Sequence, residues 1–395
     1  MGERPPDAPQ CRRGCGRGAR QDGPRWGILY IRNRRPPSGV LPETRVRESP
    51  VNLQTAELPA ARVDDGQRIR LEGIAAAARA LDPAFAHTPQ FVSDALSARL
   101  GMRMLCKVET LNPIRSFKGR GTDWLLRRLQ AERAAGPETE LVCASAGNFG
   151  QGLAYAGRRA GRSIRVFAAE TANPFKVERM RQLGAHVELA GRDFDAAKDA
   201  ARAFVAARPG ALYIEDGREP AIAEGAGTIA VELDRWPEPL EAVLVPLGNG
   251  SLLAGMGTWL RAHRPGTRIV GVCAARAPAM ALSMEVGRPV VTQTADSIAD
   301  GIAVRVPVPE AVDDLRGLVD DVLLVEEAAI VDAMRLVFET LGVVVEPAGV
   351  VGIAAAMLHR ARFAGLCVAT PLCGGNLTAQ QARRWLTPPP SGGML

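Results

Sequence analysis

The chain has 395 residues, of which 47% are hydrophobic and 23% are charged, a composition typical of a globular protein with room for one large or two medium-sized domains. Its pI of about 9.1 raises the possibility of nucleic-acid binding. However, residues 1–50 hold eleven Arg, no Lys and five Asp or Glu, so their net charge of +6 equals that of the whole chain. The remaining residues are neutral overall, which argues against a nucleic-acid partner for the body of the protein.

Residues 1–62 are rich in Gly, Pro and Arg and show little periodicity, which predicts a disordered extension. They lack the apolar segment of a secretion signal, and the chain has no run of the roughly 18 apolar residues that a membrane helix needs. We therefore expect a cytoplasmic protein with no membrane partner, and a short tail at 388–395. If the basic extension did bind nucleic acid, that binding would weaken steeply with salt and would be lost on removal of residues 1–62.

From about residue 70, short β-rich runs alternate with amphipathic stretches, which predicts an α/β fold of parallel-rich twisted sheets flanked by helices. The predicted strands are 103–108, 141–144, 164–169, 186–189, 212–214, 243–246, 269–273 and 366–372. The predicted helices include 119–134, 175–183, 193–207 and 328–341. Because ligands bind beyond the carboxyl ends of parallel strands, we expect the chemistry in the loops that follow them.

The cysteines and histidines give no metal site. Cys11 and Cys15 have no second pair of ligands nearby, and no disulfide framework is implied. Four further cysteines lie in apolar runs and are predicted to be small buried hydrophobic residues: Cys106, Cys143, Cys273 and Cys367.

The first informative loop, residues 112–120 (NPIRSFKGR), follows a predicted strand and opens a predicted helix. Lys118 lies at this junction, where a cation is unfavourable because a helix N-terminus carries partial positive charge. The chain has only four lysines, and arginine takes almost every other basic position. An amine nucleophile is a role that guanidinium cannot fill, so we predict that Lys118 is catalytic. The alternative is a solvated surface lysine.

Two further loops are typical of anion sites. Residues 145–152 (SAGNFGQG) follow one predicted strand, and residues 247–255 (LGNGSLLAG) follow another. Small residues let the backbone approach a ligand closely, and free N–H groups at a helix start bind carboxylate or phosphate. The second loop lacks the Gly-Lys-Ser/Thr ending of a P-loop, which disfavours a nucleoside triphosphate. Each loop alone is also compatible with a tight turn.

A fourth loop, residues 372–376 (LCGGN), follows the last predicted strand. In this order, the four loops together resemble the fold type II pyridoxal-phosphate enzymes, the tryptophan-synthase β family, and within it the serine/threonine dehydratases. The likeness runs from about Ile69 to Leu386. It includes the shorter motifs 87–89 (HTP), 183–185 (LGA), 224–228 (EGAGT), 298–301 (IADG) and 346–349 (EPAG).

This resemblance implies pyridoxal 5'-phosphate as cofactor and a role for each matching residue. Lys118 would carry the Schiff base and then act as the base that takes the substrate Cα proton. Phe117 would stack near the cofactor ring, Asn148 would donate to its hydroxyl oxygen, and Cys373 would face its pyridine nitrogen. The phosphate would lie against Gly248, Asn249, Gly250, Ser251 and Leu252. The substrate carboxylate would lie against Ser145, Ala146, Gly147 and Phe149, with Glu346 near the site.

Three positions distinguish reaction types within this family. Cys373 stands where many relatives have Ser, and a neutral thiol does not hold the ring nitrogen protonated, which suits elimination. Ala146 stands where racemases place a Ser that donates a proton, so racemisation would lack its second base. Cys273 stands where metal-activated relatives have a Glu, which argues against a Mg²⁺ or Ca²⁺ site.

Other positions depart from the dehydratase pattern and leave the substrate open. Asn249 and Ser251 replace two glycines of the phosphate loop, while Phe149 and Arg115 replace a His and a Gly. We expect an ammonia-lyase that converts L-threonine, L-serine or a similar β-substituted amino acid to a 2-oxoacid and ammonia. The alternative is a β- or γ-replacement enzyme of the cysteine-synthase, threonine-synthase or diaminopropionate-forming type.

The resemblance also implies an architecture. We expect a catalytic unit at 63–387, with a large domain of residues 63–119 and 214–387, a small domain of residues 120–213, and the cofactor between them. The expected assembly is a homodimer.

Overall fold

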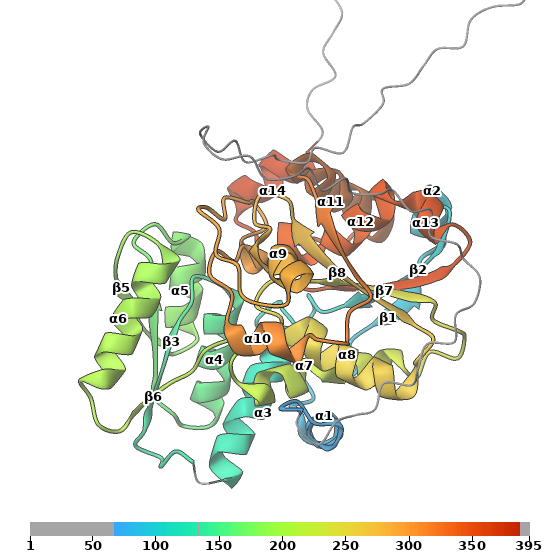
Figure 1. The fold of residues 1–395 in the computed structure, drawn as a ribbon. Coiled ribbons are helices and arrows are strands. Elements are labelled where there is room, and N and C mark those ends of the chain that lie inside the picture. Colours follow the sequence, from blue (N-terminus) through green and yellow to red (C-terminus); the bar gives the residue numbers. More distant parts are fainter. Residues whose placement is uncertain (1–66, 133, 388–395) are drawn as a thin grey trace, which may run out of the picture. The chain divides into compact units, whose positions relative to one another are not determined.

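A computed structural model of the protein describes residues 67–132 and 134–387. The predicted disordered extension and the predicted tail at 388–395 lie outside these residues. No helix in the described part of the chain is both long and apolar enough to cross a lipid bilayer. Figure 1 shows the arrangement of the helices and strands.

Six strands form the larger sheet, in the order β1-β2-β10-β7-β8-β9, and every pairing except β1 with β2 is parallel. These strands are β1 (Gln90–Val92), β2 (Arg103–Val108), β7 (Ala242–Pro246), β8 (Arg268–Ala274), β9 (Asp321–Val325) and β10 (Cys367–Leu372). The predicted α/β fold with parallel-rich sheets is confirmed. The antiparallel strand β1 and the edge strand β9 were not predicted, because a three-residue strand is too short to show alternation and an apolar run of four, residues 322–325, can equally be helical.

The smaller sheet has four parallel strands in the order β5-β4-β3-β6. They are β3 (Glu140–Ala144), β4 (Ile164–Ala168), β5 (His186–Leu189) and β6 (Ala211–Tyr213). Side chains alternate between the two faces of this sheet. Leu141 and Cys143 lie in one apolar core, whereas Val142 and Ala144 lie in another.

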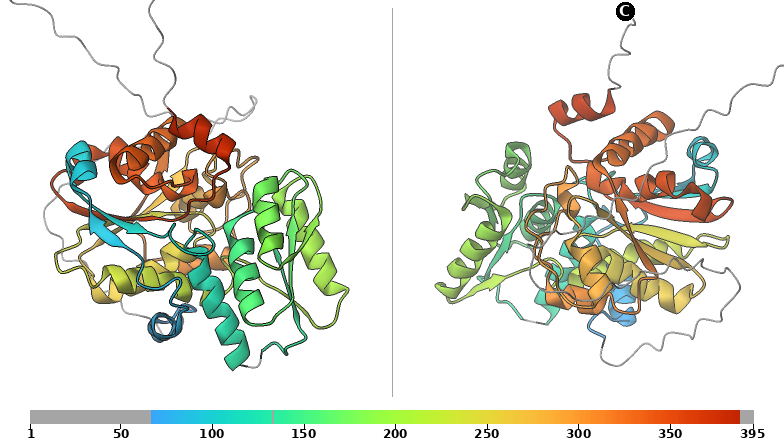
Figure 2. Two further views of the ribbon diagram at one scale, coloured as in Figure 1. Left: turned by 180° about the vertical axis from the view of Figure 1, so that it is seen from behind. Right: turned by 45° about the horizontal axis from the view of Figure 1, so that its top comes forward.

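Helices cover both faces of each sheet, as predicted (Figures 1 and 2). Against the smaller sheet these are α3 (Lys118–Ala131), α4 (Asn148–Arg159) and α5 (Pro174–Gln182) on one face and α6 (Phe194–Ala206) on the other. Against the larger sheet they are α1 (Leu71–Ala80), α7 (Pro220–Leu233) and α8 (Ser251–His263) on one face and α2 (Asp94–Leu100), α11 (Glu327–Leu341), α12 (Val351–Leu358) and α14 (Ala379–Leu386) on the other. The remaining short elements are α9 (Ala279–Val286), η1 (Asp300–Ile302), α10 (Pro309–Asp314), η2 (Pro347–Gly349) and α13 (Arg360–Phe363).

The order of elements places several loops at the carboxyl ends of parallel strands. In both sheets a strand is followed by a loop that leads into a helix, as in β2 to α3, β3 to α4, β6 to α7 and β7 to α8. Such loops gather at one edge of a parallel sheet, which is where ligands bind in this class of fold. The residue boundaries expected for a large and a small domain stay a prediction.

A buried cluster of charges connects these elements behind the loops. The Arg120 guanidinium, on α3, is completely buried. It donates two hydrogen bonds to the Glu109 carboxylate, at 2.8 and 2.9 Å, and two to the Glu232 carboxylate, at 2.8 and 3.0 Å. It also donates to the hydroxyl groups of Thr88 and Thr228. The motifs at 87–89 and 224–228 therefore supply partners for one arginine.

Lys107 completes the cluster by donating to Glu232 at 2.5 Å and to the Thr88 carbonyl at 2.6 Å. Two cations and two carboxylates thus balance one another away from water. Burial alone would raise the pKa of Glu232, but the hydrogen bonds and charges of Arg120 and Lys107 bring this pKa down to about 2. Glu232 is therefore ionised at neutral pH, and its charge is stabilised by Arg120 and Lys107 in place of water.

We predict that Arg120→Lys strongly destabilises the protein. Lysine keeps the charge but cannot reproduce the two paired contacts with carboxylates, so both Glu109 and Glu232 lose hydrogen bonds in a buried site. The free energy of unfolding should fall by about 3 kcal/mol, measured by urea denaturation. The matched control is Arg127→Lys on the same helix, whose guanidinium is 43% exposed beside Asp123 and should change stability by less than about 1 kcal/mol. Equal effects of the two substitutions would contradict this account.

Candidate active site

The loops at the carboxyl ends of the strands enclose a cavity of about 580 Å³. All of the residues that the sequence analysis placed at the cofactor or the substrate line this cavity. They come from four separate strand-to-helix junctions and from the segment around Glu346, so only the folded chain brings them together. The part that each plays in a reaction stays a prediction.

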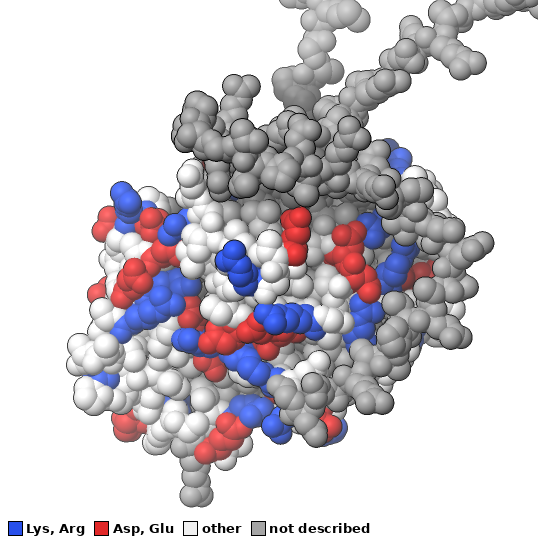
Figure 3. Space-filling view, in the orientation of Figure 1, with Lys and Arg blue, Asp and Glu red and all other residues white. Residues whose placement is uncertain are grey.

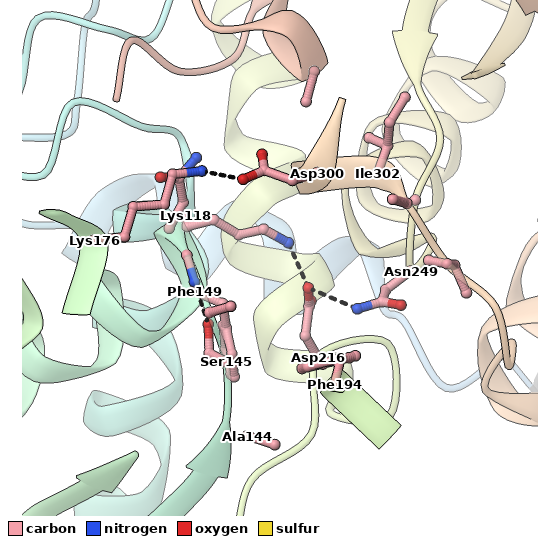
Figure 4. Close-up of a pocket in the computed structure, with 18 of the residues that line it drawn as sticks. Lys118, Ala144, Ser145, Phe149, Lys176, Phe194, Asp216, Asn249, Asp300 and Ile302 are labelled. Carbon is pink, nitrogen blue, oxygen red and sulfur yellow. Dashed lines mark hydrogen bonds and ion pairs between the residues drawn. The ribbon is translucent and has the colours of Figure 1, made fainter. Parts of the chain in front are cut away.

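Lys118 is the first residue of α3 and points into the cavity (Figure 4). The preceding loop is shaped by Asn112, whose side-chain amide donates to the carbonyls of Glu109 and Ser116 and accepts from the N–H groups of Ile114 and Ser116. These four local bonds explain why an Asn opens the loop. They fix the course of the loop that places Lys118 beyond the carboxyl end of β2.

The Lys118 ammonium forms an ion pair with Asp216, at 2.5 Å between Nζ and Oδ2. Asp216 also accepts hydrogen bonds from the Ser251 hydroxyl at 2.8 Å and from the Asn249 amide at 3.4 Å (Figure 4). Burial alone would raise the pKa of Asp216, but the charge and hydrogen bond of Lys118, with the two loop donors, hold it below its ordinary value. This carboxylate offsets the unfavourable position of a cation at a helix start.

Asp216 was not predicted as a site residue. It follows β6, at a strand-to-helix junction of the same kind as the four that the sequence analysis singled out. The strand at 212–214 was predicted, so the position of the next residues beyond its carboxyl end was an available signal. The loop after β6 lacks the run of small residues that made the other loops conspicuous in the sequence. Small residues are needed where backbone N–H groups approach a ligand, whereas Asp216 acts through its side-chain carboxylate.

The loop between β3 and α4 is held open by Ser145. Its hydroxyl oxygen accepts the N–H groups of Gly147 at 3.2 Å and Gly150 at 2.9 Å, which leaves its hydrogen to donate elsewhere. Helix α4 then begins at Asn148, and Ser145 already accepts the N–H of Gly150 in its first turn. The N–H groups of Asn148 and Phe149 have no acceptor among the described residues, and free N–H groups at a helix start are suited to binding a carboxylate.

Asn148 connects this loop to the opposite wall. Its amide nitrogen donates to Glu346 Oε1 at 2.5 Å, and its oxygen accepts from the Asn376 amide at 2.8 Å. Gly374 lies between them, and a Cβ there would come within 2.2 Å of Glu346 Oε1 and 3.1 Å of the Asn148 nitrogen. The glycine is therefore required for this contact, and the amide of Asn148 is fixed with one hydrogen still available.

Glu346 is buried, and its second oxygen, Oε2, has no hydrogen-bond donor among the described residues. Burial raises its pKa to about 7, although the charge of Lys176 opposes the shift. Lys176 is itself buried and pairs with Asp300 on η1 at 2.5 Å (Figure 4). Lys176, like Asp216, is a pocket residue that the sequence analysis did not name, and Asp300 lies in the motif 298–301, to which no site role was given.

The loop between β7 and α8 forms another wall of the cavity. Gly250 has a left-handed backbone, with φ of +92°, which glycine adopts at little cost. A Cβ on Gly248 would lie 2.9 Å from the Cα of Ile302, so the loop approaches η1 more closely than a side chain would allow. Helix α8 then begins without a side-chain cap from the described residues, which leaves backbone N–H groups for an anion.

Cys373 is buried in the wall of the same cavity. Burial raises the pKa of its thiol well above the ordinary value, and the negative charges of Glu109 and Glu346 act in the same direction. The thiol is therefore neutral at physiological pH, which suits packing and weak hydrogen bonding more than nucleophilic attack.

Phe149 and Arg115, which replace a His and a Gly of the dehydratase pattern, lie in different surroundings in the structure. Phe149 lines the cavity, whereas the Arg115 side chain is exposed and does not. Arg115 instead has a left-handed backbone, with φ of +52°, the conformation that favours glycine. Arg115 therefore does not line the cavity, and its left-handed backbone gives a physical reason for the glycine expected at this position.

We predict that Glu346→Gln changes how stability depends on pH. Between pH 4.5 and about 7 the folded wild type keeps a proton on Glu346 that the unfolded chain has lost, so its stability falls as pH rises through this window. The variant lacks this titration. Urea unfolding of protein without cofactor should show the wild type losing about 2 kcal/mol relative to the variant between pH 5 and pH 8. Glu285→Gln, at an exposed carboxylate, is the control, and parallel profiles for wild type and Glu346→Gln would refute the assignment.

Comparison with known proteins agrees with this geometry. The family model described as "Pyridoxal-phosphate dependent enzyme" matches residues 81–374. An L-threonine ammonia-lyase from Thermotoga maritima is 33% identical over 80% of this chain and 78% of that protein. Another from Geobacter sulfurreducens is 36% identical over 71% of this chain and 69% of that protein. A chloroplastic biosynthetic threonine dehydratase from Arabidopsis thaliana is 35% identical over 68% of this chain, but the match spans only 45% of the plant protein.

Solved structures give the same result. The processed form of threonine deaminase isoform 2 from Solanum lycopersicum superimposes with a TM-score of 0.72 at 29% identity, over 80% of this chain and 90% of that chain. Maize serine racemase superimposes with a TM-score of 0.73 at 26% identity, over 80% of this chain and 96% of that chain. With the family model covering most of the described residues and the lysine, glycine-rich loop and buried thiol meeting in one cavity, the chain belongs to the family of pyridoxal-phosphate-dependent enzymes.

Proposed function

We propose that this protein is an ammonia-lyase (dehydratase) that eliminates the β-substituent of L-threonine, L-serine or a similar amino acid and releases a 2-oxoacid and ammonia. One observation carries the proposal: the amine of Lys118 points into a cavity that also holds an uncapped glycine-rich helix start and a neutral Cys373 thiol. The names of the relatives support the same reaction class, since several are L-threonine ammonia-lyases.

The residues of the cavity fit pyridoxal 5'-phosphate. Gly248, Asn249, Gly250, Ser251 and Leu252 would hold the phosphate with backbone N–H groups. Phe117 would lie beside the ring, and Asn148 would donate its remaining amide hydrogen to the ring hydroxyl oxygen. Cys373 would face the ring nitrogen as a neutral thiol. When bound, this cofactor delocalises the electron pair left at Cα after loss of a proton.

The chain's own residues would then orient the substrate and move its protons. Ser145, Ala146, Gly147 and Phe149 would surround the substrate carboxylate, which the free N–H groups of Asn148 and Phe149 and the free hydroxyl hydrogen of Ser145 favour. Lys118 Nζ would accept the proton from Cα. Glu346, held against Asn148, would keep the amide of that residue in the orientation needed to donate.

Elimination is favoured over racemisation because of Ala146. This residue lines the cavity but has no atom that can donate or accept a proton. Inversion at Cα needs a base on one face and an acid on the other. We therefore expect no D-amino acid to form from an L-substrate.

The substrate range, assembly and location are further parts of the proposal. Both L-threonine and L-serine are proposed substrates, and the proposed form is a cytoplasmic homodimer. Five cysteines in the described residues are free and buried, which suits a reducing compartment.

On the face drawn in Figure 3, basic and acidic side chains intermingle with no continuous basic patch, which supports a protein without a nucleic-acid partner. Some large apolar side chains are well exposed, such as Leu111 and Leu358, as a subunit contact would require.

We predict that Lys118→Ala abolishes formation of 2-oxoacid from L-threonine and L-serine, because it removes both the attachment point of the cofactor and the Cα base. The visible absorbance of the holoenzyme should be lost with it. Borohydride reduction of the wild type followed by peptide mass spectrometry should find the cofactor on Lys118.

Lys198→Ala is the matched control, because Lys198 also lines the cavity but is paired with Glu215. It should retain the covalently attached cofactor. Attachment to Lys176 or Lys198 in the wild type would overturn the assignment of Lys118. Turnover only of O-acetyl or O-phospho amino acids with an added nucleophile would favour a replacement enzyme instead.

A further inference from the structure

Elimination of a hydroxyl group needs two proton movements, and the proposed roles above supply only one. Lys118 takes a proton from Cα, but the hydroxyl group must also gain a proton to leave as water. A second proton-carrying group should therefore lie beside the lysine, in the same cavity. Asp216 is in this position, and no role was predicted for it from the sequence.

We propose that Asp216 is a catalytic acid that delivers a proton to the departing β-substituent and is recharged by Lys118. The inference rests on the proposed ammonia-lyase function. The proton that the leaving group gains would then come from a carboxyl group of the chain itself.

The geometry of Asp216 suits a relay. One carboxylate oxygen, Oδ2, lies 2.5 Å from Lys118 Nζ, which is a distance for direct proton transfer. The other oxygen, Oδ1, accepts the Ser251 hydroxyl at 2.8 Å, and Asn249 approaches Oδ2 at 3.4 Å. Figure 4 shows the carboxylate between the lysine and Asn249 of the phosphate loop. Asp216 therefore bridges the Cα base and the phosphate loop. In this proposal the departing β-substituent would lie on this side of the cavity.

The surroundings also give Asp216 a reason to hold a proton during turnover. Without cofactor, the carboxylate is ionised and paired with the Lys118 ammonium. A phosphate bound by residues 248–252 would place negative charge beside Asp216, because Asp216 accepts hydrogen bonds from Ser251 and Asn249 of this same loop. Like charges at this distance favour the protonated carboxyl group. The loaded site thus suits an acid, whereas the empty site suits an ion pair.

The steps balance in atoms and electrons. The Cα–H bond breaks and its proton goes to Lys118 Nζ, while the electron pair forms the Cα=Cβ bond. The Cβ–O bond breaks with its electron pair on oxygen, which takes the proton of Asp216 and leaves as water. The Lys118 ammonium then returns its proton to the Asp216 carboxylate. The net result is transfer of one proton from Cα to the leaving oxygen, with no oxidation or reduction.

The other carboxylates of the cavity are less suited to this part. Glu346 is engaged by Asn148, on the loop after β3, and Asp300 is paired with Lys176. Glu215, which also lines the cavity, is paired with Lys198. None of these contacts involves Lys118 or Asp216. Asp300 is a useful comparison, because it is a pocket carboxylate paired with a lysine at the same distance of 2.5 Å.

The test compares leaving groups in the holoenzyme. L-Serine loses a hydroxyl group, which needs a proton, whereas β-chloro-L-alanine loses chloride, which does not. In Asp216→Asn, kcat/KM for L-serine should fall by about 10²-fold or more, the usual effect of removing a general acid. For β-chloro-L-alanine it should fall much less, so the ratio of the two should change by at least about tenfold. Asp216→Glu, which keeps a carboxyl group, should restore most of this ratio.

Two measurements make the outcome specific. The affinity for pyridoxal phosphate, titrated by absorbance, should stay within a few-fold of the wild type in Asp216→Asn. Asp300→Asn, the matched control, should leave the ratio between the two substrates unchanged. Equal losses on both substrates, a lost affinity for cofactor, or the same change in ratio in Asp300→Asn would refute the proposal.

The two proposals fail in different ways. If the wild type forms a 2-oxoacid from neither substrate, the ammonia-lyase function is wrong and the role of Asp216 falls with it. If the wild type is active on both and the ratio in Asp216→Asn is unchanged, only the role of Asp216 is wrong. If Asp216→Asn does not fold, Asp216→Ser provides the same comparison, and an unchanged ratio there would equally exclude the relay.

Discussion

The site depends on one buried arginine. Arg120 lies two residues after Lys118 and is fixed by two carboxylates, from the end of β2 and from α7, so the first turn of α3 cannot rotate or slide without breaking several charged hydrogen bonds. Because these bonds lie out of water, each lost contact would leave a desolvated charge, and the cost of such a displacement is high. Lys118 is consequently held in place beside the cavity by a cluster of charges that takes no part in the proposed chemistry.

The cavity in front of this cluster is assembled from two different uses of polar groups. The starts of α4 and α8 offer backbone N–H groups to anions, and small residues let the chain come close enough for those groups to be useful. The opposite walls carry side-chain charges in pairs, Lys118 with Asp216 and Lys176 with Asp300. Positive helix ends and paired carboxylates in one cavity suit a ligand that brings its own negative charge and a reaction that moves protons between neighbouring groups.

Glu346 and Cys373 show how burial sets the charge of side chains in the wall of the cavity. Burial raises the pKa of both, so that the thiol stays protonated and the carboxyl group titrates near neutrality. Asn148 is held by Glu346 on one side and Asn376 on the other. The polar groups here are thus arranged before any ligand arrives, and little reorganisation is needed on binding.

The sequence by itself determined the parallel α/β fold, the position of Lys118 at a helix start and the two small-residue loops that open helices, because these follow from local patterns: strand–helix alternation, small residues after strands and a lysine in an arginine-rich chain. Only the tertiary structure decided which distant side chains meet. Asp216, Lys176 and Asp300 join the site from segments with no glycine-rich signal, and the exposed Arg115 proved to mark a backbone conformation. The reason is physical: contacts between side chains a hundred residues apart depend on how the sheets and helices pack, which local periodicity does not encode.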